Sequence, residues 1–160
     1  GTLRLAARSA LLLQRPAGQT PEIRSGSVQL TVTSPPFLDV VHYARDNWLR
    51  CWFNGIDALT VGAGITMSRT VEEWSDAMGA VFAELYRITR NGGWVAFEVG
   101  EVKRGKVRLE EIVVPLGAAA GFECEAVLIN AQKFTKTANI WGVRNNSKGT
   151  NTNRIVLLRK

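Results

Sequence analysis

The segment Thr33–Phe37 holds the residues whose types and spacing are best suited to chemistry. It has the sequence Thr-Ser-Pro-Pro-Phe and follows an apolar run. Two consecutive prolines fix two φ angles near about −65° and remove two backbone donors, so the neighbouring carbonyls cannot join a regular ladder. A short hydroxyl residue precedes the prolines and an aromatic residue follows them. This arrangement is suited to binding a planar group that carries an exocyclic amine.

The pattern around this segment predicts alternating strands and helices. Val28–Thr33 is rich in β-branched residues and predicts a buried strand that ends at the prolines. Thr70 and Glu73 form a capping box that begins the clearest helix, whose apolar residues recur at helical spacing until Asn91–Gly93 stops it. Residues 94–100 predict a second buried strand. The Pro-Pro segment therefore follows the carboxyl end of a strand, where open α/β sheets bind their ligands.

The remaining elements predict a mostly parallel α/β sheet that closes with an antiparallel terminal hairpin. The glycine-containing residues 61–64 predict a flexible loop, because no strand precedes them. Further expected elements are a helix over 3–14, a helix over 107–120 that Pro115 kinks or shortens, a strand over 123–131 and a last strand over 154–158. We expect residues 1–160 to form a single domain.

Composition narrows the class of protein. The chain has 160 residues, of which 46% are hydrophobic, so it is long enough for one core. Its net charge of +6 favours an anionic partner, although the basic residues are scattered. One histidine, His42, and two separated cysteines, Cys51 and Cys124, argue against a metal site and favour free thiols. Residues 3–13 are too short for a secretion signal and no stretch has the length of a membrane span, so we expect a soluble, cytoplasmic protein.

Three segments together resemble a known family. Val32–Phe37 resembles the catalytic motif of amino-group DNA methyltransferases, the cytosine-N4 and adenine-N6 enzymes, which is Asp, Asn or Ser followed by Pro-Pro and an aromatic residue. Leu85–Gly93, which leads into a strand, is similar to the next conserved block, and Asn153–Leu158 to the closing hairpin. The resemblance covers about residue 27 to the C-terminus, and it matches the C-terminal catalytic half of such an enzyme. It implies a Rossmann-like, S-adenosylmethionine-dependent methyltransferase sheet that is partial.

The resemblance also implies roles for the residues of the motif. In such enzymes the target base is flipped out of the duplex, and the exocyclic amine is oriented for direct transfer of the methyl group from S-adenosylmethionine. Ser34 and the Pro35 carbonyl would accept hydrogen bonds from the amine, and Phe37 would stack on the base. The implied catalytic residues are Ser34, Pro35, Pro36 and Phe37, and Thr33 and Ser34 would border the cofactor. Serine at the first position favours cytosine N4 over adenine N6.

One element of the family has no counterpart in this sequence. Methyltransferases of this kind carry an aromatic-Gly-x-Gly turn after a strand, where the backbone approaches the cofactor. Residues 61–64 lie in the wrong context for that turn, and residues 98–101 contain one glycine. The chain would therefore supply the half that binds the target base. The chain is then a fragment, or a second chain or missing segment supplies the cofactor site, or the fold persists without catalysis.

Other readings stay open beside the leading one. The motif recognises a planar nitrogen, so an RNA or protein N-methyltransferase is an alternative function. A homo-oligomer is a further open possibility for the partner of this chain. Trp48 and Trp52 lie four residues apart and predict core positions. Asp39, His42, Tyr43 and Asp46 form either part of the base pocket or a solvated loop.

A polar stretch near the C-terminus is the candidate for contacts with the DNA backbone. Residues 135–153 are rich in Asn, Lys and Gly and predict a loop. Cationic side chains on such a loop can neutralise phosphates, although plain solvation explains them equally well. The candidate phosphate contacts are Lys133, Lys136, Arg144, Lys148 and Arg154.

Overall fold

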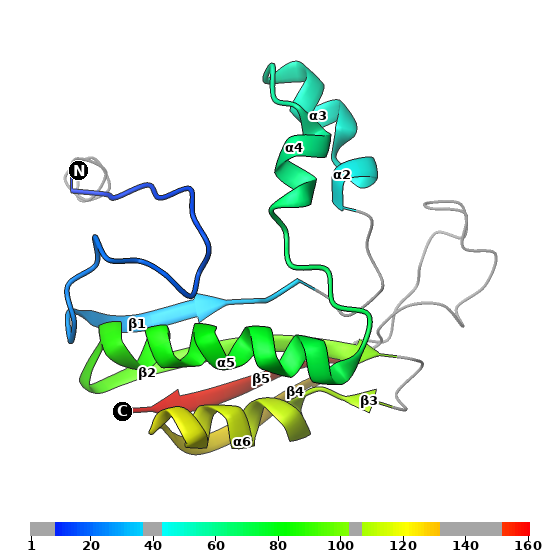
Figure 1. Ribbon diagram of the computed structural model, residues 1–160. Coiled ribbons are helices and arrows are strands. Elements are labelled where there is room, and N and C mark those ends of the chain that lie inside the picture. Colours follow the sequence, from blue (N-terminus) through cyan, green and yellow to red (C-terminus); the bar gives the residue numbers. More distant parts are fainter. Residues whose placement is uncertain (1–8, 37–42, 103–106, 132–151) are drawn as a thin grey trace.

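A strand–helix–strand unit carries the Pro-Pro segment. The computed structural model describes residues 9–36, 43–102, 107–131 and 152–160. Strands β1 (Val28–Thr33) and β2 (Thr89–Val102) lie side by side and parallel (Figure 1). The chain between them forms, in order, α2 (Tyr43–Asp46), α3 (Trp48–Phe53), α4 (Ala58–Ala63) and the long α5 (Val71–Ile88).

The sheet is mixed, and the expectation of a mostly parallel sheet is wrong. After β2 the chain forms β3 (Val107–Arg108), α6 (Glu110–Ala120), β4 (Glu123–Ala131) and β5 (Thr152–Arg159). The strand order is β1-β2-β5-β4, with β3 paired to β2. Among the described residues, only β1 and β2 pair in parallel, whereas the other three pairings are antiparallel. β1, β2 and β4 do run in one direction, but β5 enters between β2 and β4 in the opposite direction and changes both pairings.

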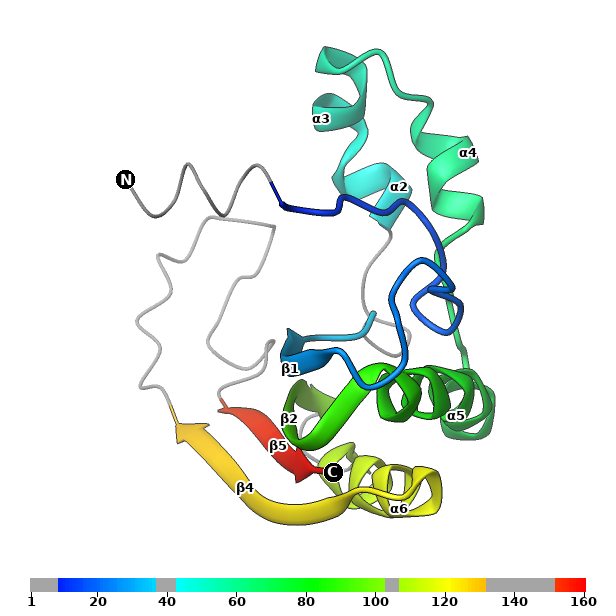
Figure 2. The same ribbon diagram turned by 90° about the vertical axis from the view of Figure 1, so that its left-hand side faces the viewer.

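Both long helices cover the same face of the sheet. In Figure 2 α5 and α6 lie together on one side of the strands. The core lies between these helices and the sheet, and Val95, Phe97 and Val99 of β2 point into it together with Val156 and Leu158 of β5. Further buried residues are Trp74, Met78, Phe82, Leu85, Ile88, Leu109, Val113 and Phe122. The alternate residues of the strands lie on the opposite face, which no described helix covers.

The predicted capping box begins α5, with one bond displaced. Thr70 Oγ1 accepts a hydrogen bond from the backbone N–H of Glu73 at 3.2 Å. Glu73 Oε2 accepts from the backbone N–H of Arg69 at 2.9 Å, one residue before the position that a capping box uses. The helix ends at Ile88, a few residues before the predicted stop, and Gly93 then passes close to the β1 backbone, where a Cβ would lie 3.0 Å from the Val28 carbonyl oxygen.

Two further expectations about local structure are wrong. In place of the loop expected over 61–64, residues 58–63 form α4, because the Asp57 side chain caps the helix by accepting from the backbone N–H of Leu59 at 3.0 Å. Residues 9–14, the described part of the first expected helix, are not helical. The helix expected over 107–120 begins at Glu110, since Val107–Arg108 pair with β2, and it contains Pro115.

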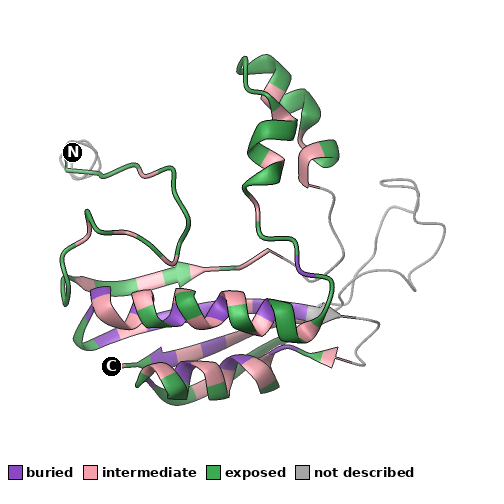
Figure 3. Cartoon of the chain, viewed as in Figure 1, coloured by how far each residue is buried: buried purple, intermediate pink, exposed green. Residues whose placement is uncertain are grey.

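Exposure departs from expectation in two places. Helices α2, α3 and α4 form an arm, defined here as residues 43–67, that projects from the sheet (Figure 1) and is largely exposed (Figure 3). Trp48 and Trp52, expected in the core, are 60% and 68% exposed on this arm. β1 has its predicted bounds but is not a buried strand, because Leu30 and Val32 are exposed.

Within the described ranges, no helix combines the length and the apolar character needed to cross a membrane.

Candidate functional site

Two hydrogen-bond acceptors lie at the carboxyl end of β1. Thr33 is the last residue of the strand and pairs with Phe97 of β2. Ser34 follows as an exposed residue, and Pro35 and Pro36 are half-buried. Within the described part of the chain, neither the Ser34 hydroxyl nor the Pro35 carbonyl has a hydrogen-bond partner. Both groups can therefore accept a hydrogen bond from a ligand.

The next carbonyl of the segment, that of Pro36, accepts a hydrogen bond from a core residue. Trp74 of α5, whose side chain is buried, donates its indole N–H to the Pro36 carbonyl oxygen at 3.2 Å. A buried indole N–H usually needs such a partner, because an unpaired donor in the core costs free energy. Two fixed proline φ angles and this bond together restrict the backbone of the segment. The orientation of Ser34 and Pro35 is therefore set by α5.

An apolar cavity of about 320 Å³ lies directly behind the segment. It is lined by the end of β1 and the Pro-Pro segment, by α5, by Phe97 of β2 and by the N-terminal segment around Ala17 and Thr20. Among the residues that the structure describes, no carboxylate and no basic side chain lines it. Besides residues 31–36, the lining is formed by Met78, Val81, Leu85, Ile88 and Phe97. Its lining suits a flat, apolar group better than a charged one.

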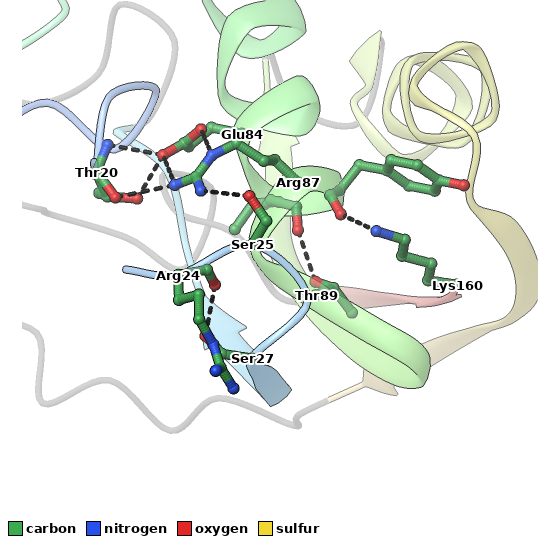
Figure 4. A network of polar contacts seen from close by, with 10 residues as sticks. Thr20, Arg24, Ser25, Ser27, Glu84, Arg87, Thr89 and Lys160 are labelled. Carbon is green, nitrogen blue, oxygen red and sulfur yellow. Dashed lines mark hydrogen bonds and ion pairs between the residues drawn. The ribbon is translucent and has the colours of Figure 1, made fainter. Parts of the chain in front are cut away.

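A polar network holds the N-terminal wall of this cavity against α5 (Figure 4). Glu84 accepts hydrogen bonds from the backbone N–H and the hydroxyl of Thr20 at 2.7 and 2.6 Å, and from Arg87 Nε at 2.7 Å. Arg87 also donates to the Thr20 carbonyl and to Ser25 Oγ, both at 2.9 Å. The Arg87 guanidinium first, and then the Thr20 donors, lower the pKa of the Glu84 carboxyl to about 2.

Arg154, a predicted phosphate contact, lies on β5 and faces the helices. Its Nε is 2.5 Å from Glu110 Oε1 of α6, and the two side chains are only 11% and 13% exposed. A phosphate would compete with this ion pair, so the phosphate role of Arg154 stays a prediction. The neighbouring Asn153 donates to Glu98 Oε1 at 2.7 Å, on the other face of the sheet. Lys133, Lys136, Arg144 and Lys148 lie outside the described residues.

The remaining candidates are divided between the arm and the undescribed segments. Phe37, Asp39 and His42 lie outside the described residues. Tyr43 is half-buried and lines a separate cavity of about 300 Å³ within the arm, and Asp46 is exposed. Trp74 is one of the apolar residues that recur at helical spacing in the helix after Thr70, but the sequence did not predict its bond to the Pro-Pro segment. The indole N–H was the available signal, since it requires an acceptor when buried.

Solved structures resemble this fold. No protein-family model matches the sequence, and no curated protein matches it. A protein from Thermus thermophilus, named as a putative DNA modification methylase and complexed with S-adenosyl-L-methionine, matches with a TM-score of 0.57 at 19% identity. That match covers 91% of this chain and 53% of that chain. The selenomethionine form of the same protein matches with a TM-score of 0.51 at 21% identity, over 86% of this chain and 46% of that chain.

The likeness concerns about half of the matched protein. The chain spans about half the length of these Thermus structures. At such low identity, the match shows the fold and no more. The described residues therefore share part of the α/β fold of these Thermus structures, with the Pro-Pro segment at the carboxyl end of β1.

Proposed function

We propose that this chain is the target-base half of an S-adenosylmethionine-dependent methyltransferase that acts on an exocyclic amine of DNA. The observation that carries the proposal is the pair of unpartnered acceptors, the Ser34 hydroxyl and the Pro35 carbonyl, which lie within the described residues at the carboxyl end of β1. An amine that donates both hydrogens to two fixed acceptors has its nitrogen lone pair held in one direction. Such positioning lowers the barrier by removing rotational freedom before the reaction.

The surroundings of the acceptors support a planar substrate. The apolar cavity behind the segment and the half-buried Pro35 and Pro36 provide flat, uncharged surface. A base that leaves a duplex loses stacking, and apolar contact in the enzyme offsets part of that cost. We propose that Phe37, as in the resembling family, stacks on the base. The serine favours cytosine N4 over adenine N6.

The methyl donor fits this chain only in part. S-adenosylmethionine would supply the methyl group as a sulfonium cation, and the reacting nitrogen would lose one proton to solvent or to the enzyme. Thr33 and Ser34 would border the donor, as the resemblance implies. The donor also carries a ribose and a charged amino acid, whereas the described lining of the cavity beside the segment contains no charged residue. The other contacts of the donor would come from outside the described residues.

We also propose that DNA is the substrate and that residues 1–160 form a single domain. The net charge of +6 and the basic residues between β4 and β5 favour a polyanion. A partner that carries phosphates would bind more weakly as the salt concentration rises. An affinity for duplex DNA that does not change between low and high salt would count against this part of the proposal.

Product analysis tests the reaction directly. The full reading frame that contains this chain, together with the frames that flank it, is expressed with duplex DNA, structured RNA or a protein extract as methyl acceptor. Nucleoside mass spectrometry is expected to detect N4-methylcytosine in the DNA. Methylation of RNA or protein alone would show that the amine site acts on a substrate class other than DNA. No methylation of any acceptor would contradict catalysis.

A further inference from the structure

A carboxylate lies beside the Pro-Pro segment on the neighbouring strand. The parallel pairing of β1 with β2 ends at Thr33 and Phe97, and one residue further along the two chains are Ser34 and Glu98. Neighbouring strands lie about 4.8 Å apart, so the backbone of Glu98 passes directly beside the end of β1. The side chain of a glutamate is long enough to extend from there toward a group that is bound at Ser34.

One oxygen of this carboxylate is held in place and the other is available. Phe97 and Val99 are buried under the helices, so Glu98 between them lies on the opposite face of the sheet, where it is half-buried. Asn153 of β5 donates to Glu98 Oε1 at 2.7 Å. Within the described part of the chain, Glu98 Oε2 has no hydrogen-bond partner and the carboxylate has no cationic partner. Glu98 Oε2 can therefore accept from a ligand.

The proposed methyl transfer releases a proton that the two acceptors at the end of β1 cannot hold. When the nitrogen lone pair forms a bond to the methyl carbon, the bond between carbon and sulfur breaks and its electron pair stays on sulfur. The positive charge thereby moves from sulfur to nitrogen, and one N–H proton has to leave. The Ser34 hydroxyl and the Pro35 carbonyl are neutral oxygens that accept a hydrogen bond but are too weakly basic to take the proton. A carboxylate is basic enough.

We propose that Glu98 takes the proton that the target amine loses during methyl transfer. A general base acts on a group within hydrogen-bond reach or through one water, and Glu98 has its available oxygen on the strand next to Ser34. The carboxylate becomes a carboxylic acid in this step and releases the proton to solvent before the next turnover. The inference rests on the proposed function, because it assigns one further step to the same site.

A structural role alone does not account for the charge of Glu98. Its bond from Asn153 connects β2 to β5, but a neutral glutamine could accept the same bond. A half-buried charge without a cationic partner costs free energy in the folded state. The nearest arginine along β5, Arg154, faces the helices and pairs with Glu110 there. A carboxylate at this place is therefore explained by a ligand that brings a proton or a positive charge to it.

Substitution combined with chemical rescue tests this role. The full reading frame is co-expressed with its flanking frames, and methyl transfer to duplex DNA is measured in a single turnover. Glu98→Gln keeps the bond from Asn153 and should lower the rate by about 10²-fold or more, with the affinity for DNA and the unfolding curve unchanged. Glu98→Ala leaves space for a small carboxylate, so added formate should raise its rate by at least about tenfold. Formate should not raise the rate of Glu98→Gln, whose amide fills that space.

A matched control removes a carboxylate elsewhere on the sheet. Glu123 is exposed and begins β4, at the end of the sheet away from Ser34. Glu123→Gln makes the same chemical change as Glu98→Gln and should keep the wild-type rate.

The outcomes separate the role of Glu98 from the proposed reaction. A Glu98→Gln protein that transfers methyl groups at the wild-type rate would overturn the inference and leave the amine site in place. A loss of rate in Glu98→Ala that formate does not restore, or an equal loss in Glu123→Gln, would also overturn it. A wild-type protein that methylates no acceptor would contradict the proposed function and the inference together.

Discussion

Trp74 donates its indole N–H to the carbonyl oxygen of Pro36 across 3.2 Å, which connects the middle of the core to the half-buried Pro-Pro segment. Since Pro36 is joined directly to Pro35, this bond restricts the strand exit that carries Ser34 and Pro35, whose two acceptors have no partner among the described residues. The core therefore contributes to the geometry of the site as well as to stability.

Replacing Trp74 tests this connection. Trp74→Phe keeps an aromatic ring but removes the donor, so we expect a loss of about 1–3 kcal/mol in the free energy of unfolding. The carbonyl ¹³C resonance of Pro36 should move upfield, because it no longer accepts a hydrogen bond. Phe82→Leu, at another fully buried position of α5, is the control and should lower stability without moving that resonance. A Pro36 resonance that is the same in the wild type and in Trp74→Phe would contradict the role assigned to the indole.

The Glu84 network predicts a pH dependence of stability. The folded state lowers the pKa of Glu84 from 4.5 to about 2. Between these values the unfolded chain binds the proton more readily, so this contribution is complete above pH 4.5 and is lost as the pH falls toward 2. Glu84→Gln should lower the free energy of unfolding at neutral pH by about 1–2 kcal/mol. The difference from wild type should shrink as the pH falls below 4.5.

Denaturant unfolding from neutral pH down to about pH 2 measures this effect. The control is Glu111→Gln, since Glu111 forms an exposed pair with Arg108 at 3.1 Å. Exposed pairs contribute little, so this variant should follow the wild-type profile within about 0.5 kcal/mol. Parallel profiles for Glu84→Gln and the wild type would show that the network does not hold the N-terminal segment.

The sequence predicted individual elements better than their neighbours in space. The bounds of β1 follow from a β-branched run that ends at the prolines, β4 has the bounds expected over 123–131, and α5 follows from its cap and its apolar spacing. The position of β5 between β2 and β4 depends on long-range pairing, which no local pattern contains. The prediction that Trp48 and Trp52 lie in the core was wrong. Their (i, i+4) spacing shows that two side chains share a helix face, but it does not show that another element covers that face.

The candidate site was predicted in part. Ser34, Pro35 and Pro36 lie at a strand end as the residue types indicated, whereas the bond from Trp74 and the Glu84–Arg87 network required the structure. Asp57 is a helix-capping residue type that could have predicted α4 from the sequence. It precedes a segment rich in small residues, and its capping side chain makes residues 58–63 helical.

Cofactor affinity tests whether this chain is half of a larger site. Isothermal titration calorimetry of the 160-residue chain with S-adenosylmethionine should give a dissociation constant weaker than about 1 mM, because the described lining of the cavity beside Ser34 offers no partner for the charged amino acid of the donor. The full reading frame, co-expressed with its flanking frames, should bind more tightly by at least about tenfold. Micromolar affinity of the chain alone would show that it holds a complete cofactor site.

The most direct test of the amine site measures methyl transfer to DNA by the full reading frame, co-expressed with its flanking frames and carrying Ser34→Ala. Removing one of two acceptors from the amine should lower the rate of transfer by about 10²-fold or more while the unfolding curve stays unchanged. Ser75→Ala, the same change on α5, is the control and should keep the wild-type rate. A Ser34→Ala protein that transfers methyl groups at the wild-type rate would contradict the assignment of Ser34 and Pro35 as the target-amine site.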